Sequence, residues 1–187
     1  MDAVLWIVLA IVVLAVLAIV AWAASRRRQT SHLQDRFGSE YDRTVESLDD
    51  RREAEQELRE REQRHEELDI RPLPDAARGR YADEWQRVQA RFVDDPEGAV
   101  NDADRLVRRV MDERGYPSEE DFERRAADVS VDYPDVVENY REGHGLWHRY
   151  RSSDGDGETE DLRKAMTHFR RLFDELLEGE RVEEGAR

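Results

Sequence analysis

Cysteine is absent from the sequence, and lysine occurs only once, at Lys164, so arginine supplies nearly all of the positive charge. Without cysteine the protein has no disulfides, no thiol nucleophile and no thiolate metal ligands. After residue 24, the sequence also lacks runs of β-branched residues and the strict alternation of apolar and polar residues that is typical of half-buried strands. No glycine-rich phosphate loop, nucleophile elbow or catalytic triad order occurs. We therefore expect an all-α protein that is not an enzyme and holds no cofactor.

Negative charge exceeds positive charge. The chain has 45 acidic and 30 basic residues and a formal net charge of −15. Such a field repels the phosphate backbones of nucleic acids, so nucleic acid is not an expected partner. The part of the chain after the opening segment has about 160 residues, enough for one domain with its own core and a connector.

One long hydrophobic run is present: all 22 residues from Ala3 to Ala24 are apolar. At about 1.5 Å per residue, a helix of this length measures roughly 33 Å and crosses a hydrocarbon core of about 30 Å. Trp6 and Trp22 stand near its two ends, where indole rings favour the membrane interface. The run therefore predicts a transmembrane anchor, with the lipid bilayer as its partner.

A cleaved signal peptide is the alternative, because Ala21–Ala23 has the small-x-small pattern of a cleavage site. Signal peptides, however, carry a basic segment before an apolar stretch of about 7–15 residues. Here only Met1 and Asp2 precede a longer run, and Arg26–Arg28 follow it. The more basic flank of a membrane helix faces the cytoplasm. We therefore expect a single-pass protein of the cell membrane, with an extracytoplasmic N-terminus and a cytoplasmic C-terminal domain.

Proline and charge patterns divide the chain into four parts. We expect an anchor over residues 1–25, a juxtamembrane segment with a polar helix and a proline-containing linker over 26–74, a small antiparallel helical bundle over 75–178, and a disordered tail over 179–187.

Within the second part, the sequence predicts one long polar helix from Ser39 to Leu68. Ser39 and Asp42 have the spacing of a capping box. After Leu48 the apolar stripe thins, and glutamate and arginine alternate as on a solvent-exposed helix. A coiled coil would need apolar heptads over three or four repeats, which are missing. We therefore expect a solvated stalk, or a helix that lies loosely on the domain.

Helix start and stop signals are clear in the bundle. Asp95 and Pro96 are typical of a helix N-terminus, and Gly115 followed by Pro117 is typical of a helix end. Between these signals, apolar residues recur at helical spacing. We expect helices over about 75–92, 96–114, 118–131, 134–150 and 159–178.

The best metal-site candidates are His144 and His148, which lie four residues apart on one expected helix, so that both imidazoles can approach one zinc ion. The residues between them lack the glutamate of a zinc-protease motif. Spacing fixes no third ligand, although Glu138 and Glu142 are near in sequence. We interpret the two histidines as a core-edge and a surface side chain and predict no metal site.

An alternating acidic stretch is the second metal candidate. A calcium loop that starts at Asp154 needs glycine at its sixth position and glutamate at its twelfth, and the chain has Thr159 and Ala165 there. The favoured interpretation is a polar loop before a helix cap. The acidic residues of this stretch are Asp154, Asp156, Glu158 and Glu160.

Five short motifs resemble an uncharacterised bacterial family of small, membrane-anchored helical proteins that are often described as secreted. The resemblance spans most of residues 33–177 and implies no established activity, cofactor or catalytic residue. The chain departs from the family pattern at Ser39, where proline is expected, and after His144. The motifs are LQDRFGSEYDR (33–43), LDIRPL (68–73), FVDDP (92–96), RGYP (114–117) and TEDLR (159–163).

Taken together, these patterns favour a single-pass membrane protein whose acidic helical domain is a non-catalytic protein-interaction or scaffolding module with an unidentified protein partner. A metal-binding enzyme or sensor that uses His144 and His148, and a secreted domain released by signal cleavage, are the alternatives. Aromatic side chains are enriched in interaction hot spots. The candidates, if exposed, are Tyr81, Tyr116, Tyr140 and Trp147.

Overall fold

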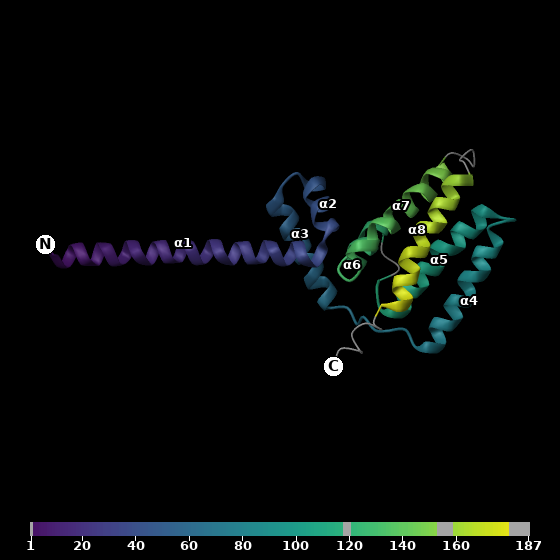
Figure 1. The fold of residues 1–187 in the computed structure, drawn as a ribbon, viewed down its shortest axis with the longest axis horizontal. Coiled ribbons are helices and arrows are strands. Elements are labelled where there is room, and N and C mark those ends of the chain that lie inside the picture. Colours follow the sequence, from purple (N-terminus) through teal and green to yellow (C-terminus); the bar gives the residue numbers. More distant parts are fainter. Residues whose placement is uncertain (1, 118–120, 153–158, 180–187) are drawn as a thin grey trace. The chain divides into compact units, whose positions relative to one another are not determined.

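The computed structural model describes residues 2–117, 121–152 and 159–179; within residues 2–15 it describes only the side chains of 6, 13 and 14. The described residues form eight helices and no strands, which confirms the predicted all-α class. The chain divides into two compact units, Met1–Leu58 and Arg59–Arg187, with the boundary inside the third helix. Figure 1 labels the helices, which are α1 (Asp2–Phe37), α2 (Ser39–Leu48), α3 (Arg51–Glu66), α4 (Asp75–Arg91), α5 (Pro96–Arg114), α6 (Phe122–Val129), α7 (Pro134–Ser152) and α8 (Thr159–Glu178).

The first unit consists of α1, α2 and the first half of α3. Gly38 interrupts the helical path between α1 and α2 with a φ of 48°, a conformation that glycine adopts without a steric penalty. The turn lets α2 fold beside the end of α1. A small apolar core results, made of Leu33, Phe37, Tyr41, Ala54 and Leu58.

The predicted single helix over Ser39–Leu68 is wrong, because two aspartates break it. Asp49 takes a left-handed conformation (φ 52°) and its N–H bonds to the carbonyl of Val45, which ends α2. Asp50 then begins α3, since its Oδ1 accepts the backbone N–H of Arg52 at 2.7 Å. The predicted capping box at Ser39 is also wrong, because Gly38 occupies the N-cap position and makes no side-chain cap bond.

The predicted solvated stalk is wrong for the first half of α3. Ala54 and Leu58, its two apolar side chains, are both 0% exposed. Their burial explains how a helix with so few apolar residues remains packed, because both lie on the same face, four residues apart.

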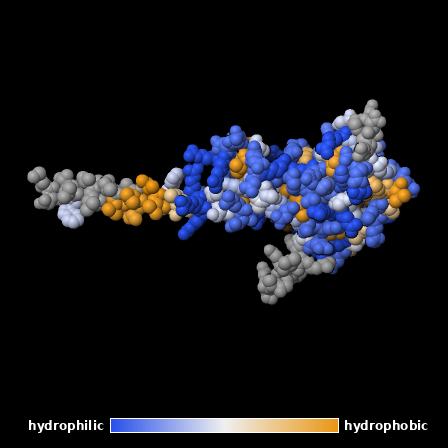
Figure 2. Space-filling model, turned by 45° about the horizontal axis from the view of Figure 1, so that its top comes forward, coloured by the Kyte–Doolittle hydropathy of each residue, from blue (hydrophilic) through white to orange (hydrophobic). Residues whose placement is uncertain are grey.

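The described part of α1 exposes large apolar side chains to solvent, and Figure 2 shows hydrophobic atoms gathered along this helix. These side chains are Trp6, Val13, Leu14, Val16, Leu17, Ile19, Val20 and Trp22. Within the part of the chain that the structure describes, none of the helices combines the length and the hydropathy needed to cross a membrane.

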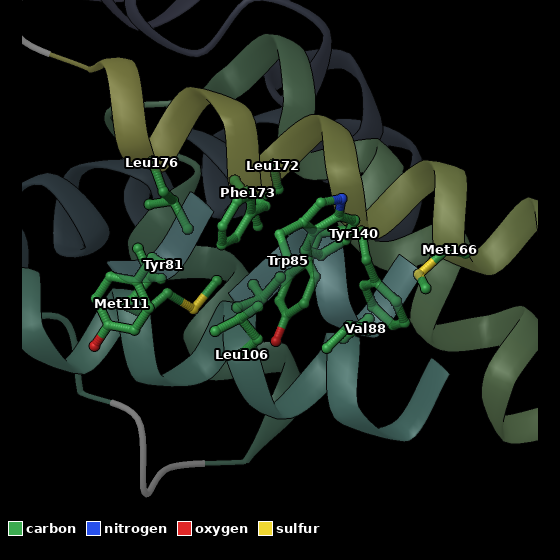
Figure 3. Packing of buried hydrophobic residues seen from close by; sticks show 14 of the residues in the cluster. Tyr81, Trp85, Val88, Leu106, Met111, Tyr140, Met166, Leu172, Phe173 and Leu176 are labelled. Atoms are coloured by element: carbon green, nitrogen blue, oxygen red, sulfur yellow. The ribbon is translucent and has the colours of Figure 1, made fainter. Parts of the chain in front are cut away.

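The second unit contains the predicted bundle. Helix α8 packs against α7 and α5, α5 packs against α4, and α6 packs against α7. In Figure 3, the indole of Trp85 lies beside the ring of Phe173, and the two stack with centroids 4.6 Å apart. Tyr140 and Phe169 are fully buried in the same core and meet edge to face. Aromatic pairs of this kind add to the free energy gained from burial.

Most of the predicted helix signals in the bundle are confirmed. The carboxylate of Asp95 accepts the N–H of Gly98 at 2.9 Å, and Pro96 is the first residue of α5. Gly115 ends α5 in the left-handed conformation, with a φ of 99°. Asp121 caps α6 by accepting the N–H of Arg124, whereas Ser118 lies outside the described residues.

Candidate functional site

A cleft of about 800 Å³ lies in the first unit, between the middle of α1 and the start of α3. It opens where the apolar residues of α1 give way to polar residues, beside Trp22, whose side chain is 63% exposed. The lining residues are Trp22, Ala23, Arg26, Arg27, Thr30, Ser31 and Gln34 from α1, Asp50 before α3, and Arg51, Arg52 and Glu55 from α3.

Glu55 organises the base of the cleft. Its Oε1 accepts hydrogen bonds from the hydroxyl of Thr30 at 2.9 Å and from the hydroxyl of Tyr41 at 3.1 Å. The Nε of Arg51 donates to the same Oε1 at 3.1 Å and to the Tyr41 oxygen at 3.0 Å. This network joins α1, α2 and α3 through one carboxylate that is only 6% exposed.

The network also fixes the charge of its members. Burial by itself raises the pKa of Glu55, but the hydrogen bonds from Thr30, Tyr41 and Arg51 outweigh burial and hold the pKa below its ordinary value. Burial raises the pKa of Tyr41, so its hydroxyl stays protonated and donates to the carboxylate. At neutral pH the base of the cleft is therefore a carboxylate whose charge is already satisfied by three donors.

The walls of the cleft carry more positive than negative charge. Four arginines line it, against two carboxylates. Among these arginines, only Arg51 forms an ion pair in the described part of the chain. The guanidinium of Arg26 lies 5.4 Å from the ring centroid of Trp22, as in a cation–π contact. A cleft with several guanidinium donors is suited to an anion, and above all to a phosphate or carboxylate.

His144 of the predicted histidine pair lies where α7 packs against α6. The ring of His144 stacks on Phe122, with centroids 3.5 Å apart and planes tilted by 7°. Burial lowers the pKa of His144. The centroid of the exposed His148 ring lies 6.3 Å from that of His144. Glu142, which is near the two histidines in sequence, has its Oε2 3.3 Å from His168 Nδ1.

Among the described residues, no group of three or more histidine, aspartate or glutamate side chains is arranged to hold a metal ion. Most of the acidic stretch considered for calcium, and the predicted tail beyond Gly179, lie outside these residues. Glu160 is described, and it forms an ion pair with Arg163 on the first turn of α8.

The aromatic residues considered as contact surfaces are core residues. Tyr81, Trp147 and Tyr116 are all buried, and Tyr140 is completely enclosed. The hydroxyls of Tyr81 and Tyr116 donate to Glu113 and Asp132. Burial is the main cause that raises the pKa of Tyr81, to about 12. These rings therefore stabilise the bundle and offer no docking surface.

Sequence reasoning missed most of the cleft. It singled out Trp22 and the arginine triplet, but it did not connect them with Arg51, Arg52 and Glu55 on α3. The available signal was the pair Asp49–Asp50, because aspartate is the residue type that both tolerates a left-handed turn and caps the next helix. A reversal at that point brings the start of α3 back to the middle of α1.

No protein-family model, no curated protein and no solved structure matches this chain. The resemblance inferred from the five sequence motifs therefore stays a prediction.

Proposed function

We propose that the chain is a single-pass membrane protein in which the apolar part of α1 is inserted in the bilayer. The observation that carries this proposal is the uninterrupted run of 22 apolar residues, followed directly by Ser25 and the triplet Arg26–Arg28. The exposed apolar side chains in the described part of α1 support it, because a continuous hydrophobic helix face in water is unfavourable. The arginine triplet favours a cytoplasmic position for the residues that follow it.

The acidic helical domain is, in this proposal, a non-catalytic protein-interaction or scaffolding module. Its support is the combination of a well-packed bundle with a strongly negative formal charge of −15 for the chain. Electrostatic complementarity guides protein association, so a partner with a basic surface is expected. Because the aromatic residues are used in the core, charged side chains dominate the surface available to such a partner.

Two single-cysteine variants test the anchor and its orientation, since the native chain has no thiol of its own. In intact cells, an impermeant maleimide is expected to label Asp2→Cys and to label Glu178→Cys only after permeabilisation. Membranes washed at alkaline pH are expected to retain the full-length chain. The reverse labelling pattern would overturn the orientation. Release of a chain shortened at Ala23, seen by mass spectrometry, would favour the secreted alternative.

A capture experiment tests the module. The full chain is captured from detergent-solubilised membranes beside Phe169→Asp, which places a charge at a fully buried position of α8 and leaves α1 intact. A partner that is recovered with the native chain and lost with Phe169→Asp supports the proposal. A chain that recovers no stoichiometric partner, or the same proteins with both variants, contradicts it.

Metal analysis addresses the remaining alternative. Among the described residues, no third histidine, aspartate or glutamate joins His144 and His148 in a group that could hold a metal ion. The purified full chain is expected to carry no stoichiometric zinc or nickel. Stoichiometric metal that is present in the native chain and lost in His148→Ala would contradict the module and favour a metal-dependent enzyme or sensor.

A further inference from the structure

We infer that the cleft between α1 and α3 binds the phosphate group of an anionic phospholipid. This inference deepens the proposed function and rests on it, because it takes the apolar part of α1 to lie in the bilayer. The cleft begins at Trp22, the last aromatic residue of the apolar run, and continues one turn further at Arg26. Indole rings and arginines concentrate at the depth of the lipid headgroups. A cleft at this position therefore faces headgroup phosphates.

The donor groups of the cleft match a phosphate ester. Guanidinium groups bind phosphate oxygens through paired hydrogen bonds, and an ammonium group does not reproduce this geometry. Arg26 and Arg27 come from α1, whereas Arg52 comes from α3, so the donors approach from two helices. The side chain of Ser31 adds a hydroxyl to the same lining. The volume of about 800 Å³ is within the range of small-molecule sites and accommodates a glycerophosphate group.

The two carboxylates of the cleft do not cancel this positive charge. Glu55 is satisfied by three donors at its Oε1. The Oδ1 of Asp50 accepts the backbone N–H groups of Arg52 and Glu53 at the start of α3. Both carboxylates thus hold the helices in position, whereas Arg27 and Arg52 are exposed and form no ion pair with another described residue.

A specific phosphate site can be distinguished from a basic segment that is attracted to any negative membrane, because the two differ in which arginines contribute to binding. A basic segment acts through its number of charges, so every arginine of the triplet contributes about equally. The cleft is lined by Arg26 and Arg27 but not by Arg28. It also includes Arg52, which is 24 positions beyond the triplet. The inference therefore requires that Arg27 and Arg52 matter and that Arg28 does not.

The experiment compares Arg27→Gln, Arg52→Gln and Arg28→Gln, three variants with the same change in net charge. The full chain in a neutral detergent is titrated with short-chain phosphatidylglycerol, short-chain phosphatidylcholine or inorganic phosphate, and the bound species are counted by native mass spectrometry. The native chain is expected to bind phosphatidylglycerol about tenfold more tightly than phosphatidylcholine. Arg27→Gln and Arg52→Gln are each expected to weaken that binding about tenfold, and Arg28→Gln less than about twofold. Equal helical content of the three variants shows that folding is unchanged.

Several outcomes overturn the inference. If Arg28→Gln and Arg27→Gln weaken phosphatidylglycerol binding equally, the binding is general electrostatic attraction and not a specific site. Binding of inorganic phosphate as tight as that of phosphatidylglycerol would show a soluble anion as the ligand. The outcome is also separable from the anchor test: a chain that stays in washed membranes but binds both lipids equally contradicts only the lipid site. A chain that is extracted by alkali but binds phosphatidylglycerol selectively contradicts only the anchor.

Discussion

Arg114, at the end of α5, is predicted to be the main polar support of α8, although its role is invisible in the sequence. The side chain is 3% exposed. Its Nη1 donates to the carbonyl of Leu176 at 2.9 Å and to the hydroxyl of Tyr133, and its Nη2 donates to the carbonyl of Gly179 at 3.2 Å. One guanidinium therefore satisfies carbonyl groups at the C-terminus of α8, which have no partner within the helix itself. Replacement by methionine keeps an unbranched side chain in place of the aliphatic stem and removes all these donors.

The size of the effect follows from these bonds. A hydrogen bond to a charged group contributes about 1.5–3 kcal/mol to the free energy of unfolding. Removal of a buried guanidinium also removes the cost of its desolvation, which offsets part of the loss. We expect Arg114→Met to lower the free energy of unfolding by about 2–3 kcal/mol. For a unit of this size, that change lowers the melting temperature by roughly 6–12 °C.

Urea and thermal unfolding of the full chain in detergent, followed by circular dichroism, measure this change. The matched control is Arg105→Met on the same helix, where the guanidinium is 59% exposed and lies 3.4 Å from Asp102. An exposed pair of this kind contributes less than about 1 kcal/mol. If Arg114→Met and Arg105→Met unfold at the same denaturant concentration, the guanidinium does not support α8 and the reasoning is refuted.

Two further predictions concern the turn after α5 and the base of the cleft. Gly115→Ala is expected to lower the free energy of unfolding by at least about 1–2 kcal/mol, because alanine is strained at a φ of 99° and its Cβ would lie 2.2 Å from the carbonyl oxygen of Asp69. Gly79→Ala, in open space within α4, is the control and is expected to raise it by about 0.5–1 kcal/mol in the same unfolding assay. The pKa of Glu55 is lower in the folded chain than its ordinary value of 4.5, so its ionised carboxylate stabilises the first unit at a pH above about 4.5. This contribution is lost as the pH falls through the still lower pKa of the folded state. The protection factors of the α2 amides, which compare the observed exchange rate with the intrinsic rate at each pH, are expected to fall below about pH 4.5 in the native chain. Glu55→Gln, with no titrating group there, is expected to show no such step; a step of equal size in both contradicts the assignment.

The bundle was largely predictable from the sequence because its signals are local. Asp95 and Pro96 begin α5, and Gly115 ends it, through contacts with residues no more than four positions away. The apolar stripes then identify the buried faces. Such signals do not depend on which helix lies opposite, so they are readable before the tertiary structure is known.

The first unit was not predictable in the same way. Its polar residues look solvated in the sequence, but Glu55 is buried because its partners Thr30, Tyr41 and Arg51 come from three helices. Two of these partners are 25 and 14 positions away. A buried carboxylate is tolerated only when such partners satisfy its charge. Because these partners are distant in the sequence, the local pattern of α3 indicates a solvent-exposed polar helix.

The two proposed interactions, with an anionic lipid and with a basic protein partner, use surfaces of opposite charge. The cleft presents an excess of guanidinium groups to an anion, whereas the chain as a whole carries a charge of −15. An anionic lipid surface therefore attracts the cleft but repels most of the acidic domain, and a basic protein partner is attracted to the acidic domain but repelled by the arginine triplet. Neutralising Arg27 weakens lipid binding without removing a charge that a basic partner would use. Loss of partner binding in Arg27→Gln would show that the partner depends on the cleft, which contradicts two separate binding surfaces.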